Sequence, residues 1–243
     1  MGTTRNLDNY WKDYFSDCGP PEATSEGDLF KQVAHTICKQ PIPNQQFVEI
    51  LKHIVFRLQL SHKDHLLDFC CGNGLFSYEL AAHVNQLTGI DFVPRNIRIA
   101  QSQKSRQNTA YVVSDVTVPL MGIFAGGRLP NKFLMNYSLA YFSPSHLSTI
   151  LGNIYTLLAK RSFNFLLTGI PNFALKWNFY DTPERRARHL ENEKDPANAN
   201  DGLGRWWTAD EIQLICDQVG LEVSIQNMPP ELSNYRMDAL ISS

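Results

Sequence analysis

The stretch that decides the fold of this chain runs from Leu66 to Phe76 and reads Leu-Leu-Asp-Phe-Cys-Cys-Gly-Asn-Gly-Leu-Phe. Residues 65–69 are largely apolar, which predicts a central strand of a parallel sheet, because such strands are buried on both faces. Gly72 and Gly74 predict a tight turn after that strand, since glycine adopts backbone conformations that other residues avoid. A helix is expected to follow from residue 75 to residue 84, and its first turn would offer unpaired N–H groups and partial positive charge to a ligand.

Working outward from this stretch, strand and helix patterns alternate to the end of the chain. The predicted strands are residues 65–69, 86–90, 110–114, 132–136, 162–168, 221–225 and 235–241. Each of the first five is expected to lead into a helix, and the last two to form a hairpin, because a connection without a helix is most simply antiparallel. We therefore predict an α/β fold, with a seven-stranded, mostly parallel, doubly wound sheet and an antiparallel last strand.

Two helix starts carry local signals. Ser143-Pro144 reads as an N-cap followed by proline at the first helical position. Thr208 and Glu211 have the spacing of a capping box, in which each side chain bonds the other residue's backbone N–H. Both signals predict that a helix begins directly after them.

Two segments lie outside the alternating pattern. Residues 1–63 form an N-terminal extension that is helical from about residue 44 to residue 60, and residues 64–243 form the main domain. The extension carries an aromatic group that could close over a ligand as a lid, at Tyr10, Trp11, Tyr14 and Phe15. Residues 171–207 interrupt the main domain, and a connection of this length in a compact domain indicates a substrate lid or a binding loop.

Composition narrows the class of protein. The chain has 243 residues, 43% of them hydrophobic, and a net charge of −2, which fits one large domain without a field that gathers nucleic acid or anionic lipid. We find no apolar run of membrane-spanning length and no signal-peptide layout, so we expect a cytoplasmic protein without a membrane partner. The five cysteines lack paired spacing, which indicates reduced thiols and no metal site.

The residues Asp68-x-Cys70-x-Gly72-x-Gly74 resemble motif I of the class I, Rossmann-like S-adenosylmethionine-dependent methyltransferases. That motif is usually Asp/Glu-x-Gly-x-Gly-x-Gly. Cys70 replaces the first glycine, which keeps a small side chain but removes the freedom to adopt positive φ. The resemblance implies that this loop binds the methionine part of the cofactor S-adenosylmethionine, with Asp68 near its ammonium group.

Three further segments match the same family in the family's order. Asp91 matches the acid that accepts hydrogen bonds from both ribose hydroxyls, and Phe92 would lie against the adenine. Asp115 and Val116 match the segment that receives the adenine amino group. Asn136 begins the segment that borders both methionine and acceptor. The set falls at the ends of consecutive predicted strands, where open α/β sheets bind ligands.

Candidate catalytic residues follow the fourth predicted strand. Tyr137 is the first choice, as a residue that positions the acceptor or as a base with a lowered pKa. Tyr141 and His146 come next, and His146 titrates in the useful pH range. The cluster Arg185-Arg-Ala-Arg-His189 could bind an acidic or phosphorylated acceptor, although a solvated helix face is the commoner explanation of such a cluster.

We therefore expect an S-adenosylmethionine-dependent methyltransferase that acts on oxygen or nitrogen of a small molecule such as a sugar or a natural-product intermediate, as a monomer or homodimer. The pattern Tyr10-Trp11, Lys31-Gln-Val and Pro41-Ile-Pro resembles bacterial small-molecule methyltransferases. Two alternatives remain, an NAD(P)-dependent oxidoreductase and a non-catalytic S-adenosylmethionine-binding protein. Against the oxidoreductase, Ser77 stands where Gly-x-Gly-x-x-Gly requires its third glycine. A nucleic-acid methylase is disfavoured because no Asn/Asp-Pro-Pro-Tyr/Phe signature is present.

Overall fold

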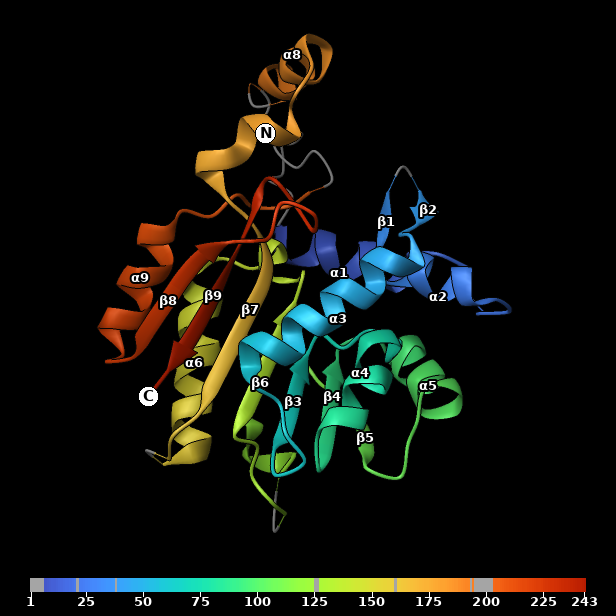
Figure 1. Ribbon diagram of the computed structural model, residues 1–243, viewed down its shortest axis with the longest axis vertical. Coiled ribbons are helices and arrows are strands. Elements are labelled where there is room, and N and C mark those ends of the chain that lie inside the picture. Colours follow the sequence, from blue (N-terminus) through green and yellow to red (C-terminus); the bar gives the residue numbers. More distant parts are fainter. Residues whose placement is uncertain are drawn as a thin grey trace.

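A seven-stranded sheet forms the centre of the computed structural model, which describes residues 7–20, 22–37, 39–124, 127–159, 161–192, 194 and 203–243 (Figure 1). The order across the sheet is β5-β4-β3-β6-β7-β9-β8. Its strands are β3 (His65–Phe69), β4 (Gln86–Asp91), β5 (Thr109–Val113), β6 (Lys132–Asn136), β7 (Asn164–Pro171), β8 (Glu222–Asn227) and β9 (Arg236–Ser242). β9 runs antiparallel to both of its neighbours, β7 and β8, and the other pairings in the sheet are parallel, so the predicted sheet is confirmed.

Helices cover both faces of this sheet. One face packs against α3 (Asn44–Leu58), α4 (Leu75–Leu80) and α5 (Pro94–Gln103). The other face packs against α6 (Pro144–Leu158) and α9 (Ala209–Gln218). Figure 1 shows α3 in front of the sheet and α6 behind it. This three-layer arrangement explains why every residue of β3 is buried, as its apolar sequence predicts.

The predicted helix starts are confirmed by their caps. Ser143 and His146 bond each other's backbone N–H at the start of α6, and Pro144 takes the first helical position. Thr208 and Glu211 do the same at the start of α9. Each cap satisfies N–H groups that the first helical turn leaves without a partner.

The expectation of five strand–helix units is wrong at the third unit. In the described part of the connection from β5 to β6, the helical element is the short 3-10 helix η2 (Leu120–Gly122) and no α-helix forms. Pro119 and Gly122 lie in this connection, and proline and glycine are the poorest helix formers. The first unit also differs, because α4 ends at Leu80 and tightens into the 3-10 helix η1 (Ala81–His83).

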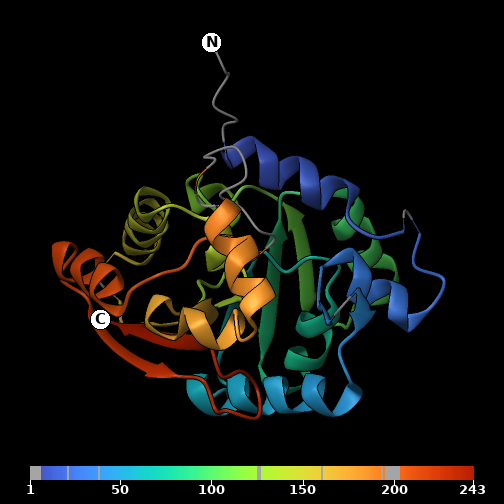
Figure 2. The same ribbon diagram turned by 90° about the horizontal axis from the view of Figure 1, so that it is seen from above.

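Apart from α3, which packs on a face of the sheet, the N-terminal extension lies at the carboxyl edge of the parallel strands, and so does the insertion. The extension holds α1 (Leu7–Asp17), α2 (Glu26–Gln32) and a small hairpin, β1 (Thr36–Ile37) with β2 (Gln40–Pro41). The insertion holds η4 (Phe173–Leu175), α7 (Lys176–Phe179) and α8 (Pro183–Asn192). Figure 1 shows α8 projecting beyond this edge, and Figure 2 looks down on it. Residues 193 and 195–202 of the insertion lie outside the described residues.

Membrane-spanning helices and metal-binding clusters are both absent from the described residues. No helix there combines the length and apolar character that crossing a bilayer requires. Nor does that part of the chain bring together three or more His, Cys, Asp or Glu side chains in a metal-binding arrangement.

Candidate active site

A cavity of about 240 Å³ opens at the carboxyl edge of the sheet. It lies where the strand order reverses, since the chain runs from β3 outward to β5 and then returns to β6 on the other side of β3. Ligands of open α/β sheets bind at such reversal points. The predicted site residues that line it are Asp68, Cys70, Gly72, Asp91, Phe92, Asp115, Val116, Asn136, Tyr137, Tyr141 and His146.

Three residues of the loop after β3 have a left-handed backbone conformation. Cys70, Gly72 and Gly74 have φ angles of 58°, 56° and 78°. The expectation that cysteine forfeits positive φ is therefore wrong, and Cys70 adopts it at a cost of about 1–2 kcal/mol. Gly74 is outside the cavity lining and packs toward α5 instead, where a Cβ would lie 3.0 Å from the Ala100 Cβ.

Asp68, the last residue but one of β3, carries a buried carboxyl group that lines the cavity. Its Oδ2 accepts a hydrogen bond of 2.5 Å from the Ser77 hydroxyl. Burial raises its pKa to about 7, the Ser77 bond opposes the rise, and the nearby Asp91 carboxylate adds to it. A cation placed beside Asp68 would stabilise the ionised form.

Asp91 ends β4 and connects two turns. Its Oδ2 accepts from the backbone N–H of Gly72 and its Oδ1 from that of Val93, both at 2.9 Å. Burial nevertheless raises the pKa of Asp91 to about 6. Each carboxylate oxygen retains a further lone pair, so Asp91 can order the loop and still accept hydrogen bonds from a ligand.

Asp115, after β5, connects the sheet edge to the N-terminal extension. Its Oδ2 pairs with the Nζ of Lys12 in α1 at 2.9 Å, and its Oδ1 accepts from the Thr117 hydroxyl and backbone N–H. The Thr117 and Lys12 bonds outweigh burial and hold the pKa of Asp115 below its ordinary value. Asp115 is thus ionised at neutral pH, and α1 lies over this end of the cavity.

Aromatic rings of α1 form a second wall with Tyr141. The ring of Tyr141 lies 4.5 Å from that of Trp11 and 4.9 Å from that of Phe15, measured between centroids. Trp11 is 7% exposed although it belongs to a terminal helix. The sequence indicated these aromatic residues as a lid, and the structure brings two of them to the cavity.

Comparison with known proteins gives the family of the central part of the chain. The family described as a methyltransferase domain, Methyltransf_25, matches residues 66–161. Residues 66–161 are therefore similar to a methyltransferase domain. A curated relative, an uncharacterized methyltransferase of Schizosaccharomyces pombe, is 41% identical over 59 residues. That match covers 24% of this chain and 23% of the relative.

Solved structures show that the fold extends over the whole chain. Magnesium protoporphyrin IX methyltransferase from Synechocystis PCC 6803, with bound SAH, has a TM-score of 0.59 at 14% identity, covering 98% of this chain and 99% of that one. The DhpI complex with SAM and HEP has a TM-score of 0.61 at 13% identity, covering 99% of each chain. The fold is that of class I S-adenosylmethionine-dependent methyltransferases.

The motif loop of the methyltransferase domain is bonded to the extension by residues that the sequence did not single out. The buried Asn73 side chain donates from Nδ2 to the Leu29 carbonyl and to Gln32 Oε1, at 2.8 and 2.9 Å. Gln32 in turn donates to the Pro20 carbonyl at 2.9 Å. The amide of Asn73, between the two glycines of the turn, is the sequence feature that could have indicated this contact. Its partners, however, lie more than 40 residues away in the sequence.

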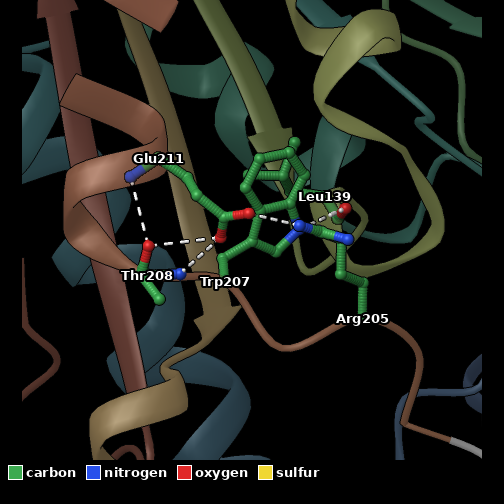
Figure 3. A network of polar contacts seen from close by, with 5 residues as sticks. All are labelled: Leu139, Arg205, Trp207, Thr208 and Glu211. Carbon is green, nitrogen blue, oxygen red and sulfur yellow. Dashed lines mark hydrogen bonds and ion pairs between the residues drawn. The ribbon is translucent and has the colours of Figure 1, made fainter. Parts of the chain in front are cut away.

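The end of the insertion packs beside Leu139, which follows β6 (Figure 3). The Trp207 indole donates to the Leu139 carbonyl at 3.2 Å, and the Arg205 backbone N–H donates to the Ala140 carbonyl at 2.7 Å. Arg205 also pairs with Glu211 of the α9 cap. These contacts hold η3 (Leu139–Tyr141), which carries Tyr141 into the cavity wall.

Tyr137 also lines the cavity and has a backbone φ of 55°. Its hydroxyl is directed at the Met228 sulfur, 3.9 Å away. Burial raises the pKa of Tyr137 to about 12, and burial also raises that of Tyr141. Both phenols are therefore protonated at neutral pH. His146 lines the cavity and its Nδ1 accepts from the Ser143 backbone N–H in the α6 cap.

His35 and Arg236 line the cavity, although neither was predicted from the sequence to be a catalytic or cofactor-binding residue. His35 precedes β1, and its ring lies 4.8 Å from that of Phe76 and 5.4 Å from that of Tyr137. Burial, reinforced by the charge of Arg236, lowers the pKa of His35 to about 4, so its imidazole is neutral. Arg236 begins β9 and has no motif to mark it, because the strands that bring it to the cavity lie far apart in the sequence.

Proposed function

We propose that this protein transfers a methyl group from S-adenosylmethionine to an oxygen or nitrogen atom of a small molecule in the cytoplasm. The observation that carries the proposal is one cavity, on a methyltransferase domain, lined by three carboxyl groups at the ends of β3, β4 and β5. Structural neighbours with bound SAH and SAM support the choice of cofactor. Their acceptors differ in kind, so we propose only the class of acceptor.

The chemistry of the lining fits this cofactor. Asp68 and Asp91 are buried acids whose raised pKa values would fall again beside a cationic ligand. Asn96 and Asn136 also line the cavity, and the Oδ1 atom of each is buried without a hydrogen-bond partner among the described residues. Unsatisfied buried acceptors of this kind call for a ligand that donates.

We assign the cofactor contacts as follows. Asp68 and Asn136 would hold the methionine part, the Gly72 loop would lie against it, and Asp91 would accept from the ribose hydroxyls. Phe92 and Val116 would contact the adenine, with Asp115 beside them. When bound, S-adenosylmethionine supplies a methyl group already activated by its sulfonium sulfur.

The remaining work of the protein is to orient the acceptor and exclude water. Tyr141, Trp11 and Phe15 provide an apolar wall for the acceptor. The protonated phenols of Tyr137 and Tyr141 position it, since their pKa values make them poor bases at neutral pH. The neutral imidazole of His35 can accept a hydrogen bond from the attacking hydroxyl or amine. His146 also lines the cavity, but its Nδ1 already accepts from the Ser143 backbone N–H, so a neutral His146 would donate from Nε2 and position the acceptor.

We further propose that residues 1–63 act as a lid on the main domain, residues 64–243. The support is the Lys12 to Asp115 ion pair and the Asn73 bonds to α2, which attach the extension to both ends of the cofactor side. Residues 171–207 would contribute a second lid through the Trp207 contact with η3.

Calorimetric titration with S-adenosylmethionine, S-adenosylhomocysteine and NAD tests the cofactor. We expect micromolar binding of the first two and none of NAD. Asp91→Ala should weaken binding by about 1–3 kcal/mol through lost charge-assisted hydrogen bonds. Asp91→Asn keeps one oxygen that can accept a hydrogen bond from the loop. Comparison of the two variants therefore separates the effect of loop order on affinity from that of the hydrogen bonds to the ribose. Exposed Asp13 provides the matched control, Asp13→Asn, which should bind as wild type. NAD binding alone would refute the proposal.

A further inference from the structure

Charge is distributed unevenly along the cavity. The three acids of the lining, Asp68, Asp91 and Asp115, come from the β3, β4 and β5 half of the sheet. The lining also contains two basic side chains, Lys12 and Arg236. Lys12 is paired with Asp115, whereas Arg236 comes from β9 on the opposite half. The cavity thus has an acidic end and a basic end.

A backbone carbonyl and two aromatic rings surround the guanidinium of Arg236. Its Nη1 donates to the Gly169 carbonyl, and the group lies over the rings of Tyr137 and Tyr235, 4.9 and 5.1 Å from their centroids. Within the described part of the chain it makes no ion pair. Asp238, two residues along β9, directs its carboxylate instead to His53 and to the Gly169 N–H.

Arg236 is too distant to serve the acids of the cofactor end. β9 is three strands from β3, which is about 14 Å at the usual strand spacing. Its charge contributes to the pKa values of His35, Tyr137 and Tyr141. It is not among the causes of the raised pKa values of Asp68 and Asp91. The side chain therefore acts on the acceptor end of the cavity.

We infer that Arg236 binds a negatively charged group of the methyl acceptor, a carboxylate or a phosphate, while a ring of the acceptor lies against Trp11, Phe15 and Tyr141. An arginine fork presents several N–H donors to such a group, and aromatic walls favour a flat partner. The inference rests on the proposed function and names the acceptor class, a ring-bearing anion. Arg236 is a specificity residue at this site.

The test uses benzoate, its neutral isostere benzamide, and phenyl phosphate on protein saturated with S-adenosylhomocysteine. Tryptophan fluorescence can report binding because Trp11 lines the cavity. For wild type we expect benzoate or phenyl phosphate to bind about tenfold or more tightly than benzamide, the effect of one charge-assisted contact. The preferred anion identifies carboxylate or phosphate. Equal binding of all three probes, or no binding of either anion, would overturn the inference.

Variants test whether Arg236 causes the preference for the anions over benzamide. Arg236→Gln should abolish it, Arg236→Lys should retain part of it, and Arg98→Gln, which removes an exposed arginine of α5, should leave it intact. Thermal unfolding shows whether Arg236→Gln is folded. If it is not, Arg236→Lys decides the matter. An Arg236→Lys variant that binds the anions no more tightly than benzamide refutes the assignment.

A second arm separates the acceptor from the methionine carboxylate of the cofactor. Arg236→Gln should change the affinity for S-adenosylhomocysteine by less than about twofold. Weaker binding of S-adenosylhomocysteine with unchanged binding of 5′-methylthioadenosine, which lacks the amino-acid part, would assign Arg236 to the cofactor and overturn the inference. Failure of the wild type to bind S-adenosylhomocysteine would instead refute the proposed function.

Discussion

Replacing Asp68 by asparagine should stabilise the protein at alkaline pH while weakening cofactor binding. The Asp68 side chain is 2% exposed, and burial raises its pKa from 3.8 to about 7. Between these values the folded state holds a proton that the unfolded state has lost. Stability therefore falls as pH rises through this window, because the unfolded state binds fewer protons than the folded state.

The size of the effect follows from the two pKa values. Between pH 5 and pH 8 the unfolded carboxyl group is ionised throughout, while the folded one ionises near its pKa of about 7. At about 1.4 kcal/mol for each pKa unit, wild type should lose about 2–3 kcal/mol of unfolding free energy over this interval. Asp68→Asn removes this loss and can retain the hydrogen bond with Ser77.

Urea unfolding of wild type and Asp68→Asn at both pH values measures the difference directly. The advantage of the variant should be about 2–3 kcal/mol larger at pH 8 than at pH 5. Asp13→Asn, at an exposed position in α1, should show no such change. If the advantage of Asp68→Asn is the same at both pH values, Asp68 is not a buried carboxylate with a raised pKa. In the same variant, affinity for S-adenosylhomocysteine should fall about tenfold or more, since the charge beside the ammonium group is lost.

Two further changes test the architecture around the cavity. Gly72→Ala should lower stability by about 1–3 kcal/mol and weaken binding of S-adenosylhomocysteine, because φ is 56° and the new Cβ would lie 2.5 Å from Val33 Cγ1. Urea unfolding of Gly72→Ala with and without Val33→Ala separates backbone strain from the clash, and stability equal to wild type in the single variant would contradict both. Thr208→Val should cost about 1 kcal/mol by removing the α9 cap, whereas an unchanged melting temperature would show that Glu211 alone satisfies it.

Much of the fold was predictable from the sequence because its signals are local. The apolar stretch before Asp68, the glycines after it and the caps at Ser143 and Thr208 each act within a few residues. Alternation of strands and helices then implies a parallel sheet, and the sheet brings the ends of its strands together. The carboxyl groups of Asp68, Asp91 and Asp115 therefore meet at one cavity, as the resemblance implied.

The sequence determined the class of fold and the antiparallel last strand, and it predicted many of the residues that line the cavity, while the tertiary structure decided which other residues join them. Nothing near Arg236 marks it, and it reaches the cavity only because β9 inserts beside β7. Asn73 gains its partners only because α2 packs on the glycine turn. The ionisation of Asp68 and His35 likewise depends on how completely distant segments bury them. Burial and long-range contacts are properties of the assembled chain, so no local pattern of residues can specify them.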